Sequence, residues 1–152
     1  MSKNPLKNVP LDGKTAKISI VLPYFNEELG LTMLENCKKT LTENGVRETN
    51  ISLTRVAGCL EIPYACKKII DRKKTDVIIA IGIIIKGKTR HFDLVAETTH
   101  QGLMHLQLQE KVPIIFGILA CSNIKQAKER VSKNGLNKGR EAAIAALLQT
   151  KL

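Results

Sequence analysis

DVIIAIGIIIKGKTRHF, residues 76–92, is the stretch of this chain that decides the fold. Its first half, residues 77–85, contains no charge and consists of six isoleucines, one valine, one alanine and one glycine. A run this short and this rich in β-branched side chains is typical of a strand buried on both faces rather than of a helix. Such strands belong to parallel sheets covered by helices, so residues 77–85 predict the centre of an α/β domain.

The second half of the stretch, residues 86–91 (KGKTRH), is small, basic and polar. It lies between the predicted strand and the next helical pattern. In open parallel sheets, ligands bind at the carboxyl ends of the strands. A loop that opens a helix there offers free backbone N–H groups, which suit an anion. One segment therefore predicts both the middle of the core and an anion site beside it.

The rest of the chain alternates between strand and helix in the same way. Strands are expected at residues 17–22, 50–56, 77–85 and 113–119, and a helical pattern follows each of them. This alternation predicts an α/β fold: a single-domain three-layer α/β/α sandwich with a four-stranded parallel sheet, of the flavodoxin-like type. Residues 1–16 have two prolines and little periodicity. They are expected to form an extended N-terminal arm on a domain of residues 17–152.

Helix boundaries follow from capping residues and turn residues. Asn26 is expected to cap the first helix, which would turn Leu31 toward the core and end at Asn44. Either Ser122 or Asn123 is expected to cap the short helix after the fourth strand. Fold type alone does not give a function, so the function has to come from the loops.

Composition excludes several classes of protein. The chain has 152 residues, of which 43% are hydrophobic and 25% charged, as expected for one globular domain. It has no apolar run of about 18 residues and no apolar N-terminal segment, so we expect a cytoplasmic protein with no membrane span. The net charge is +10, but the lysines are scattered and aromatic residues are only 3% of the chain. We therefore expect attraction of an anionic substrate rather than nucleic-acid binding.

The cysteines do not predict a metal site. None forms a C-x-x-C pair or stands at zinc-finger spacing from a histidine, so we expect buried structural thiols and no metal. The four are Cys37, Cys59, Cys66 and Cys121.

Four residues of the predicted loops have a structural and a functional interpretation each. Phe25 is either a core or surface residue or a flat stacking surface. Glu61 is either an exposed helix-start residue or a hydrogen-bond acceptor for a polyol or amine. His91 is either structural or, with an ordinary pKa near ~6.5, a proton-transfer group. Arg130 either completes a helix carboxyl end or binds phosphate in a bidentate manner.

Six short motifs in order resemble the lumazine synthase family over about residues 17–148. They are Phe25-Asn26, Gly58-x-x-Glu61-Ile62-Pro63, Gly87-x-Thr89-x-His91-Phe92, Pro113-x-x-Phe116-Gly117, Glu129-Arg130 and Asn137-Lys138-Gly139. The resemblance implies condensation of 5-amino-6-(D-ribitylamino)uracil with 3,4-dihydroxy-2-butanone 4-phosphate. The products are 6,7-dimethyl-8-ribityllumazine, phosphate and water, and no cofactor is used.

The resemblance also implies a role for each matching residue. His91 would transfer protons, and Lys88 and Thr89 with Arg130 would hold the phosphate. The pyrimidine and its ribityl chain would be bound by Phe25, Cys59, Leu60, Glu61, Ile83, Ile84, Ile85, Phe116 and Lys138. Of all these residues, Phe116, Lys138 and Arg130 would come from a neighbouring subunit.

The implied partners are copies of the same chain. Family members form homo-pentamers, and some stack twelve pentamers into a 60-subunit shell; riboflavin synthase is a further partner that the resemblance allows. Ala57, Cys59, Lys86 and Arg90 depart from the residues usual in the family. These departures motivate an alternative, a non-catalytic lumazine-binding, flavin-binding or shell-forming protein of the same fold.

Overall fold

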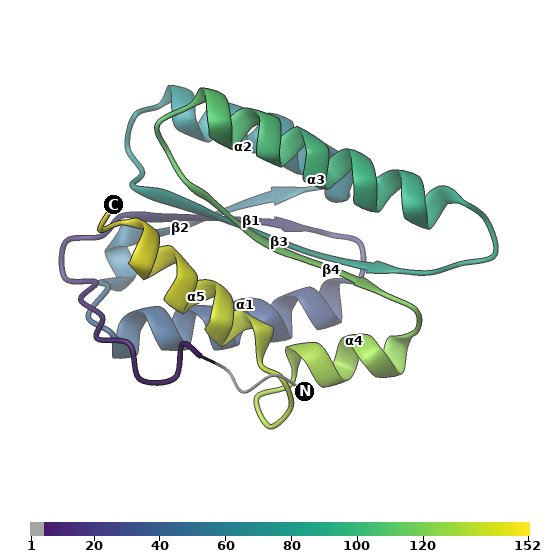
Figure 1. The fold of residues 1–152 in the computed structure, drawn as a ribbon, viewed down its shortest axis with the longest axis horizontal. Coiled ribbons are helices and arrows are strands. Elements are labelled where there is room, and N and C mark those ends of the chain that lie inside the picture. The colour runs from purple at the N-terminus through teal and green to yellow at the C-terminus, as the bar shows by residue number, and fades with distance from the viewer. Residues whose placement is uncertain (1–4) are drawn as a thin grey trace.

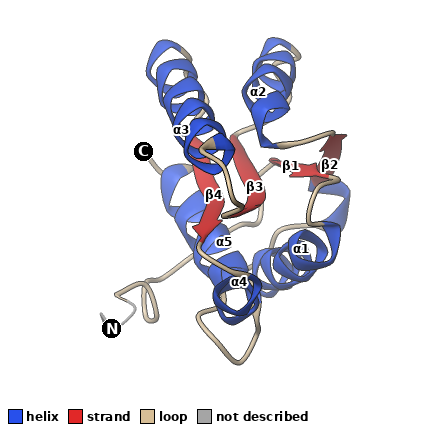
Figure 2. Cartoon of the chain, turned by 90° about the vertical axis from the view of Figure 1, so that its right-hand side faces the viewer, coloured by secondary structure: helices blue, strands red, loops and turns tan. Residues whose placement is uncertain are grey.

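The computed structural model describes residues 5–152 as a parallel sheet between two layers of helices (Figure 1). Helices α2 and α3 cover one face of the sheet, and α1, α4 and α5 cover the other (Figures 1 and 2). The predicted α/β class and four-stranded parallel sheet are confirmed. In chain order the elements are β1 (Ile18–Pro23), α1 (Glu27–Glu43), η1 (Glu48–Asn50), β2 (Ile51–Val56), η2 (Cys59–Glu61), α2 (Ile62–Asp71), β3 (Val77–Ile85), α3 (His91–Gln109), β4 (Ile114–Cys121), α4 (Ile124–Val131) and α5 (Lys138–Gln149).

The strand order is β2-β1-β3-β4, with every pair parallel. The chain first steps outward from β1 to β2 and then returns across β1 to β3, so the order reverses between β1 and β3. In open α/β sheets, ligands bind in the crevice at the carboxyl ends of the strands where this reversal occurs. The topology therefore predicts a ligand site at the loops that follow β1 and β3.

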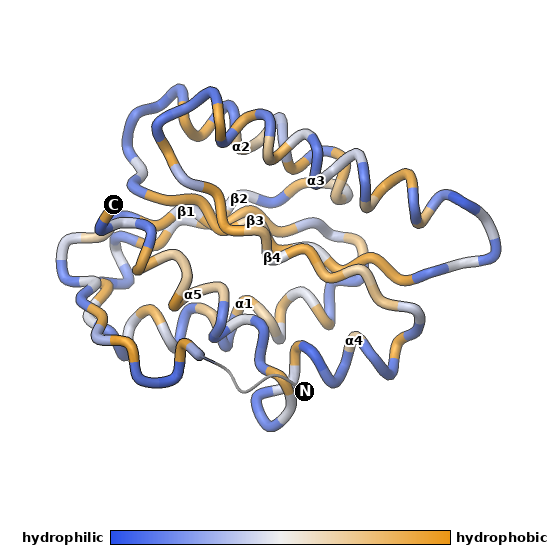
Figure 3. The backbone as a smooth tube through the Cα atoms, in the orientation of Figure 1, coloured by the Kyte–Doolittle hydropathy of each residue, from blue (hydrophilic) through white to orange (hydrophobic). Residues whose placement is uncertain are grey.

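The core lies on both faces of β3, the strand predicted to be central. Ile79 and Ile81 pack with the α1, α4 and α5 layer, and Ile78 and Ala80 pack with the α2 and α3 layer. All four are fully buried. Figure 3 shows β3 as strongly hydrophobic and the loop after β3 as hydrophilic. Burying one isoleucine contributes about 1.5–3 kcal/mol, so β3 is a large share of the stability.

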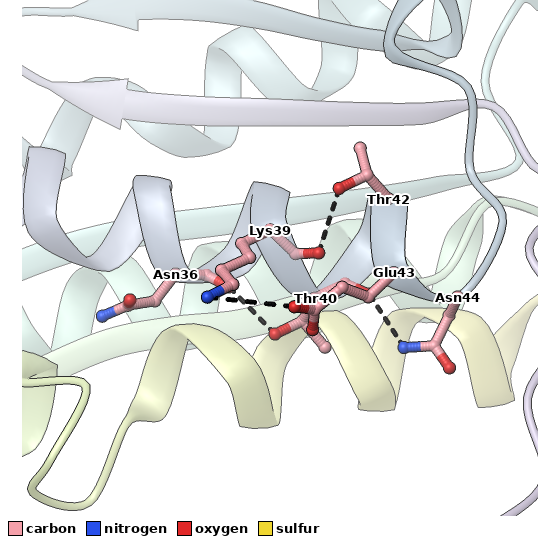
Figure 4. A network of polar contacts seen from close by, with 6 residues as sticks. All are labelled: Asn36, Lys39, Thr40, Thr42, Glu43 and Asn44. Carbon is pink, nitrogen blue, oxygen red and sulfur yellow. Dashed lines mark hydrogen bonds and ion pairs between the residues drawn. The ribbon is translucent and has the colours of Figure 1, made fainter.

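Helices α1 and α5 pack closely because Gly139 has no side chain: a Cβ there would collide with the Met33 carbonyl. The second half of α1 carries a polar ladder (Figure 4). The Thr40 hydroxyl donates to the Asn36 carbonyl at 2.9 Å, and the Asn44 side chain donates to the Thr40 carbonyl at 2.8 Å. The bond from Asn44 satisfies a carbonyl in the last turn of the helix, which stops at the predicted position.

Two expectations about α1 are wrong. Asn26 precedes the helix but its side chain does not cap it; the residue is left-handed, with φ 56°, and its amide instead donates to the carbonyl of Ile83 at 2.7 Å. Leu31 is 42% exposed, and Met33 takes the buried place beside it. For α4, the cap is Asn123, whose side chain accepts from the Gln126 N–H.

The predicted arm is described from residue 5 onward; its first four residues lie outside the described residues. Leu11 and Ala16 contact the core, and the Gly13 N–H donates to the Asn44 carbonyl at 2.8 Å. From residue 5 to residue 152, no helix combines the length and the apolar content that crossing a bilayer requires.

Candidate active site

Four loops meet at the carboxyl edge of the sheet because all four strands run in the same direction. They are residues 24–26 after β1, 57–61 after β2, 86–90 after β3 and 122–123 after β4. Figure 2 views the molecule from this side. The sites predicted from sequence fall mostly on these loops.

Phe25 and Glu61 lie on either side of Gly58. A Cβ on Gly58 would stand 3.3 Å from the Phe25 ring and 3.2 Å from a Glu61 carboxylate oxygen. The Glu61 Oε2 accepts the Gly58 N–H at 2.8 Å, while the second carboxylate oxygen has no partner among the described residues. Phe25 is 73% exposed, so it is not a core residue. Its open ring face and the unused carboxylate oxygen can both receive a ligand.

The end of β3 is joined directly to the Phe25 loop. Asn26 Nδ2 donates to the Ile83 carbonyl, which fixes the residue after Phe25 over the switch between β1 and β3. Ile83 and Ile84 are buried and Ile85 is half-buried, so the side chains of Ile83 and Ile84 are not available to a ligand. The structure thus brings Phe25, Glu61 and the end of β3 to one place.

Cys59 is a buried packing residue beneath this region, and its thiol is not a reactive group. Its thiol is buried against Gly82, where a Cβ would come within 2.6 Å of the Cys59 Sγ. Burial raises the pKa of the Cys59 thiol to about 11, and the negative charge of Glu61 adds to the effect. The thiol is therefore protonated at neutral pH. Leu60, next to it, is 47% exposed.

The loop after β3 is an open cationic segment at the start of α3. Lys86, Lys88 and Arg90 are exposed, and none of them forms an ion pair within residues 5–152. The Thr89 hydroxyl accepts the N–H of His91, the first residue of α3, at 3.3 Å. Positive side chains and the amino terminus of a helix both favour an anion. His91 is exposed beside them.

Arg130 turns back from the last turn of α4 toward the same edge. Its Nη1 donates to the Gln126 carbonyl at 3.4 Å, and the residue is half-buried. Burial raises the pKa of the Cys121 thiol, and the positive charge of Arg130 acts against that rise. Cys121 ends β4, and its carbonyl accepts the N–H of Lys86 at 2.9 Å. The guanidinium is therefore near Cys121, at the carboxyl end of β4.

Phe116 lies away from this edge. In the sheet register it pairs with Ala80, and Cys121 at the edge pairs with Ile85. Cys121 is five positions along the strand from Phe116, a distance of roughly 17 Å at about 3.3 Å per residue. The Phe116 ring instead contacts His100 of α3 edge-on, with a centroid distance of 5.9 Å.

Lys138 lies with Phe116 rather than with the loops. Both residues line a shallow cavity of about 260 Å³, together with Gly117 of β4 and Ala142 of α5. Lys138 Nζ is 2.8 Å from a carboxylate oxygen of Glu141. The predicted site residues therefore form two groups within one chain: a loop group at the carboxyl edge and a second group beside β4 and α5.

The sequence matches the family of 6,7-dimethyl-8-ribityllumazine synthase over residues 15–152. The chain belongs to this family. The match spans every strand and helix and includes both groups of residues. The resemblance drawn from the six motifs is confirmed, and lumazine synthase is a transferase family.

Sequence reasoning missed one residue near the site of this lumazine synthase family member. Arg55 at the end of β2 forms an ion pair with Glu27 at 2.8 Å and stacks over the Tyr24 ring at 4.1 Å. Its contacts join residues about 30 positions apart, so no local motif reveals them. The one available signal was an arginine inside a strand that otherwise carries no charge.

Proposed function

We propose that this chain is an active lumazine synthase. It condenses 5-amino-6-(D-ribitylamino)uracil with 3,4-dihydroxy-2-butanone 4-phosphate to give 6,7-dimethyl-8-ribityllumazine, phosphate and water. The proposal rests on one observation: a single edge of the sheet has groups suited to a flat ring with a polyol and groups suited to a phosphate. Phe25 and the free oxygen of Glu61 suit a flat ring with a polyol, and the open cationic loop suits a phosphate.

The pyrimidine half of the site uses the loops after β1 and β2. The ring stacks on the exposed face of Phe25, and the ribityl hydroxyls donate to the free oxygen of Glu61 while Leu60 contacts the chain. Backbone groups of residues 83–85 bind the ring edge, because the side chains of Ile83 and Ile84 point into the core. Hydrogen bonds to the charged carboxylate are worth about 1.5–3 kcal/mol each.

The phosphate half uses the loop after β3. Lys88, the Thr89 hydroxyl and the first N–H groups of α3 face the phosphate, and the planar guanidinium of Arg130 from the neighbouring subunit binds two of its oxygens. Only one N–H of Arg130 is used within the described chain, by the Gln126 carbonyl. The remaining donors are available to an anion.

The chemistry is a series of proton transfers between two bound reactants. The pyrimidine 5-amino group attacks the butanone carbonyl, and loss of water forms an imine. Removal of a carbon-bound proton then expels phosphate, and the ribityl-bearing nitrogen closes the ring with loss of water. His91 accepts and returns protons beside the phosphate, and holding the reactants together supplies much of the acceleration.

The second half of the site comes from a neighbouring copy. Within one chain, Phe116 lies roughly 17 Å along β4 from the carboxyl edge, so its own loops are out of its reach. A ring of identical subunits places the same residues of the next chain against this edge. We propose a homo-pentamer in which Phe116, Lys138 and Arg130 of one subunit complete the site of the next.

Turnover and mass test the proposal together. Purified protein is mixed with both substrates, and the absorbance and green fluorescence of the lumazine are followed against the spontaneous reaction. We expect product far faster than this background, from a particle of about 84 kDa, five times the 16.8 kDa chain, or from a shell of pentamers. Tight binding of lumazine with no turnover would contradict the proposal and favour the non-catalytic alternative.

A further inference from the structure

Arg55 reaches from the end of β2 across to the segment that carries Phe25. Its Nε donates to the Leu22 carbonyl at 3.1 Å, and its Nη2 approaches the Pro23 carbonyl at 3.4 Å. The same Nη2 lies 2.8 Å from a carboxylate oxygen of Glu27. The guanidinium plane stacks on the Tyr24 ring, with 4.1 Å from Cζ to the ring centroid.

The four partners of Arg55 lie on both sides of Phe25 along the chain: three precede it, and Glu27 follows it. Phe25 has little support of its own: its side chain is 73% exposed, and its N–H makes a long bond of 3.3 Å to the Ala57 carbonyl. The next residue, Asn26, has φ 56°, a conformation that L-residues adopt at a cost. The loop therefore keeps its shape only because neighbouring groups hold it.

Besides the backbone bonds of Tyr24 and Phe25 to the carbonyls of Val56 and Ala57, two side chains hold the loop from opposite sides. Asn26 anchors the loop to β3 through the Ile83 carbonyl at 2.7 Å, and Arg55 anchors it to β2 through Tyr24 and Glu27. The Arg55 side chain is only 22% exposed, so its contacts are partly shielded from solvent. A lysine could keep the ion pair with Glu27, but it lacks the planar fork needed to stack on the Tyr24 ring and donate to two carbonyls together.

We propose that Arg55 is a positioning residue for the pyrimidine half of the site. It does not touch substrate; it holds residues 23–27 so that the Phe25 ring presents its face to the pyrimidine. The proposal rests on the proposed function for its kinetic consequence. The phosphate half stands on a different loop, after β3, and does not depend on Arg55.

If Arg55 has this role, replacing it should change the KM for the ribitylamino-pyrimidine and not the KM for the butanone phosphate. In Arg55→Met, we expect the KM for the ribitylamino-pyrimidine to rise about tenfold, equivalent to about 1.4 kcal/mol. The KM for the butanone phosphate should stay within about twofold of the original, a difference of less than 0.5 kcal/mol. Arg55→Lys should lie between, because it restores the charge opposite Glu27 without the stacking on Tyr24.

Lys67→Met is the matched control. Lys67 forms ion pairs at 2.8 Å with Asp71 and Glu110 on the α2 and α3 side of the molecule, so the variant removes a charge and comparable bonds elsewhere. Its kinetics should match those of the unchanged protein. If Arg55→Met raises both KM values equally, or behaves as Lys67→Met does, Arg55 is not a positioning residue.

A second measurement does not depend on turnover. The chain has no tryptophan, so Phe25→Trp introduces a single tryptophan, which can be excited apart from the two tyrosines, at the position in question. Adding Arg55→Met should lower its fluorescence anisotropy, and adding Lys67→Met should not. If the unchanged protein makes no lumazine but Arg55→Met lowers the anisotropy of the Phe25→Trp protein, the proposed function fails and the positioning by Arg55 stands. If the unchanged protein makes lumazine but Arg55→Met leaves the anisotropy of the Phe25→Trp protein unchanged, the positioning role of Arg55 is overturned.

Discussion

Replacing Glu61 by glutamine and by alanine separates the two tasks of its carboxylate. One oxygen accepts the Gly58 N–H at 2.8 Å, and the other is free for the ribityl chain. Glutamine can keep the bond to Gly58 only by turning its carbonyl oxygen inward, which places an NH₂ donor where the ligand meets an acceptor. Alanine removes both, and leaves the N–H of a buried glycine without its partner.

The expected magnitudes follow from these contacts. A hydrogen bond to a charged group is worth about 1.5–3 kcal/mol and one between neutral groups about 0.5–1.5 kcal/mol. Glu61→Gln should therefore weaken pyrimidine binding by about 1–1.5 kcal/mol, roughly 5- to 13-fold, and lower the free energy of unfolding by no more than about the same amount, because the bond to Gly58 also passes to a neutral acceptor. Glu61→Ala should weaken binding by about 1.5–3 kcal/mol and lower the free energy of unfolding by about 1–3 kcal/mol.

Binding is measured by titrating the ribitylamino-pyrimidine, and stability by urea unfolding of the same samples. Glu35→Gln, which removes an exposed carboxylate of α1, is the control for the loss of one negative charge. Equal affinity in Glu61→Gln and the unchanged protein would refute the assigned ligand contact. Unchanged stability in Glu61→Ala would refute the structural role of the bond to Gly58.

Three further predictions concern other parts of the site and core. His91→Ala should slow turnover by about 10²-fold without changing particle mass, because the exposed ring supports no packing; kinetics and light scattering check this. Gly82→Ala should lower the free energy of unfolding by about 1–3 kcal/mol through collision with Cys59, whereas Gly87→Ala, with nothing within 4 Å, should not; urea unfolding compares them. Burial raises the pKa of the Cys66 thiol from 9.0 to about 12, so the folded state loses stability as pH rises above 9. Cys66→Ala should remove about 1.3 kcal/mol of the decline in unfolding free energy between pH 8 and pH 10.

The fold could be predicted from sequence because its signals are local. The uncharged β-branched run of residues 77–85 is β3 to the residue, and Asn44 ends α1 as expected. β4 was the least well bounded strand, since it continues through Ala120 and Cys121, which have no β-branched pattern. Those two residues pair with Ile84 and Ile85, so the neighbouring strand rather than the local sequence extends β4.

The arrangement of the site was less accessible to sequence reasoning. The motif residues Phe25 and Glu61 were identified, but their meeting across Gly58 depends on the close approach of two loops. Asn26 has the composition of a helix cap, yet its left-handed backbone turns the amide to Ile83, 57 residues away. Contacts over such separations leave no periodicity or spacing to detect, and the contacts of Arg55 were missed for the same reason.

The central claim is that one functional site is built from the loops of one subunit and the β4, α4 and α5 residues of the next. Mixing two impaired variants tests it directly. Glu61→Ala damages the loop half, and Arg130→Ala damages the half supplied by the neighbour, so each variant alone has only damaged sites. Mixed assemblies refolded from equal amounts should contain about one quarter intact sites, because each half is intact with even odds.

The measurement is the rate of lumazine formation by the mixed Glu61→Ala and Arg130→Ala particles. We expect about one quarter of the rate of the unchanged protein, well above that of either variant alone. A rate no higher than the mean of the two variants, in particles shown by mass to contain both chains, would mean that Glu61 and Arg130 serve the site of a single chain and would contradict the account.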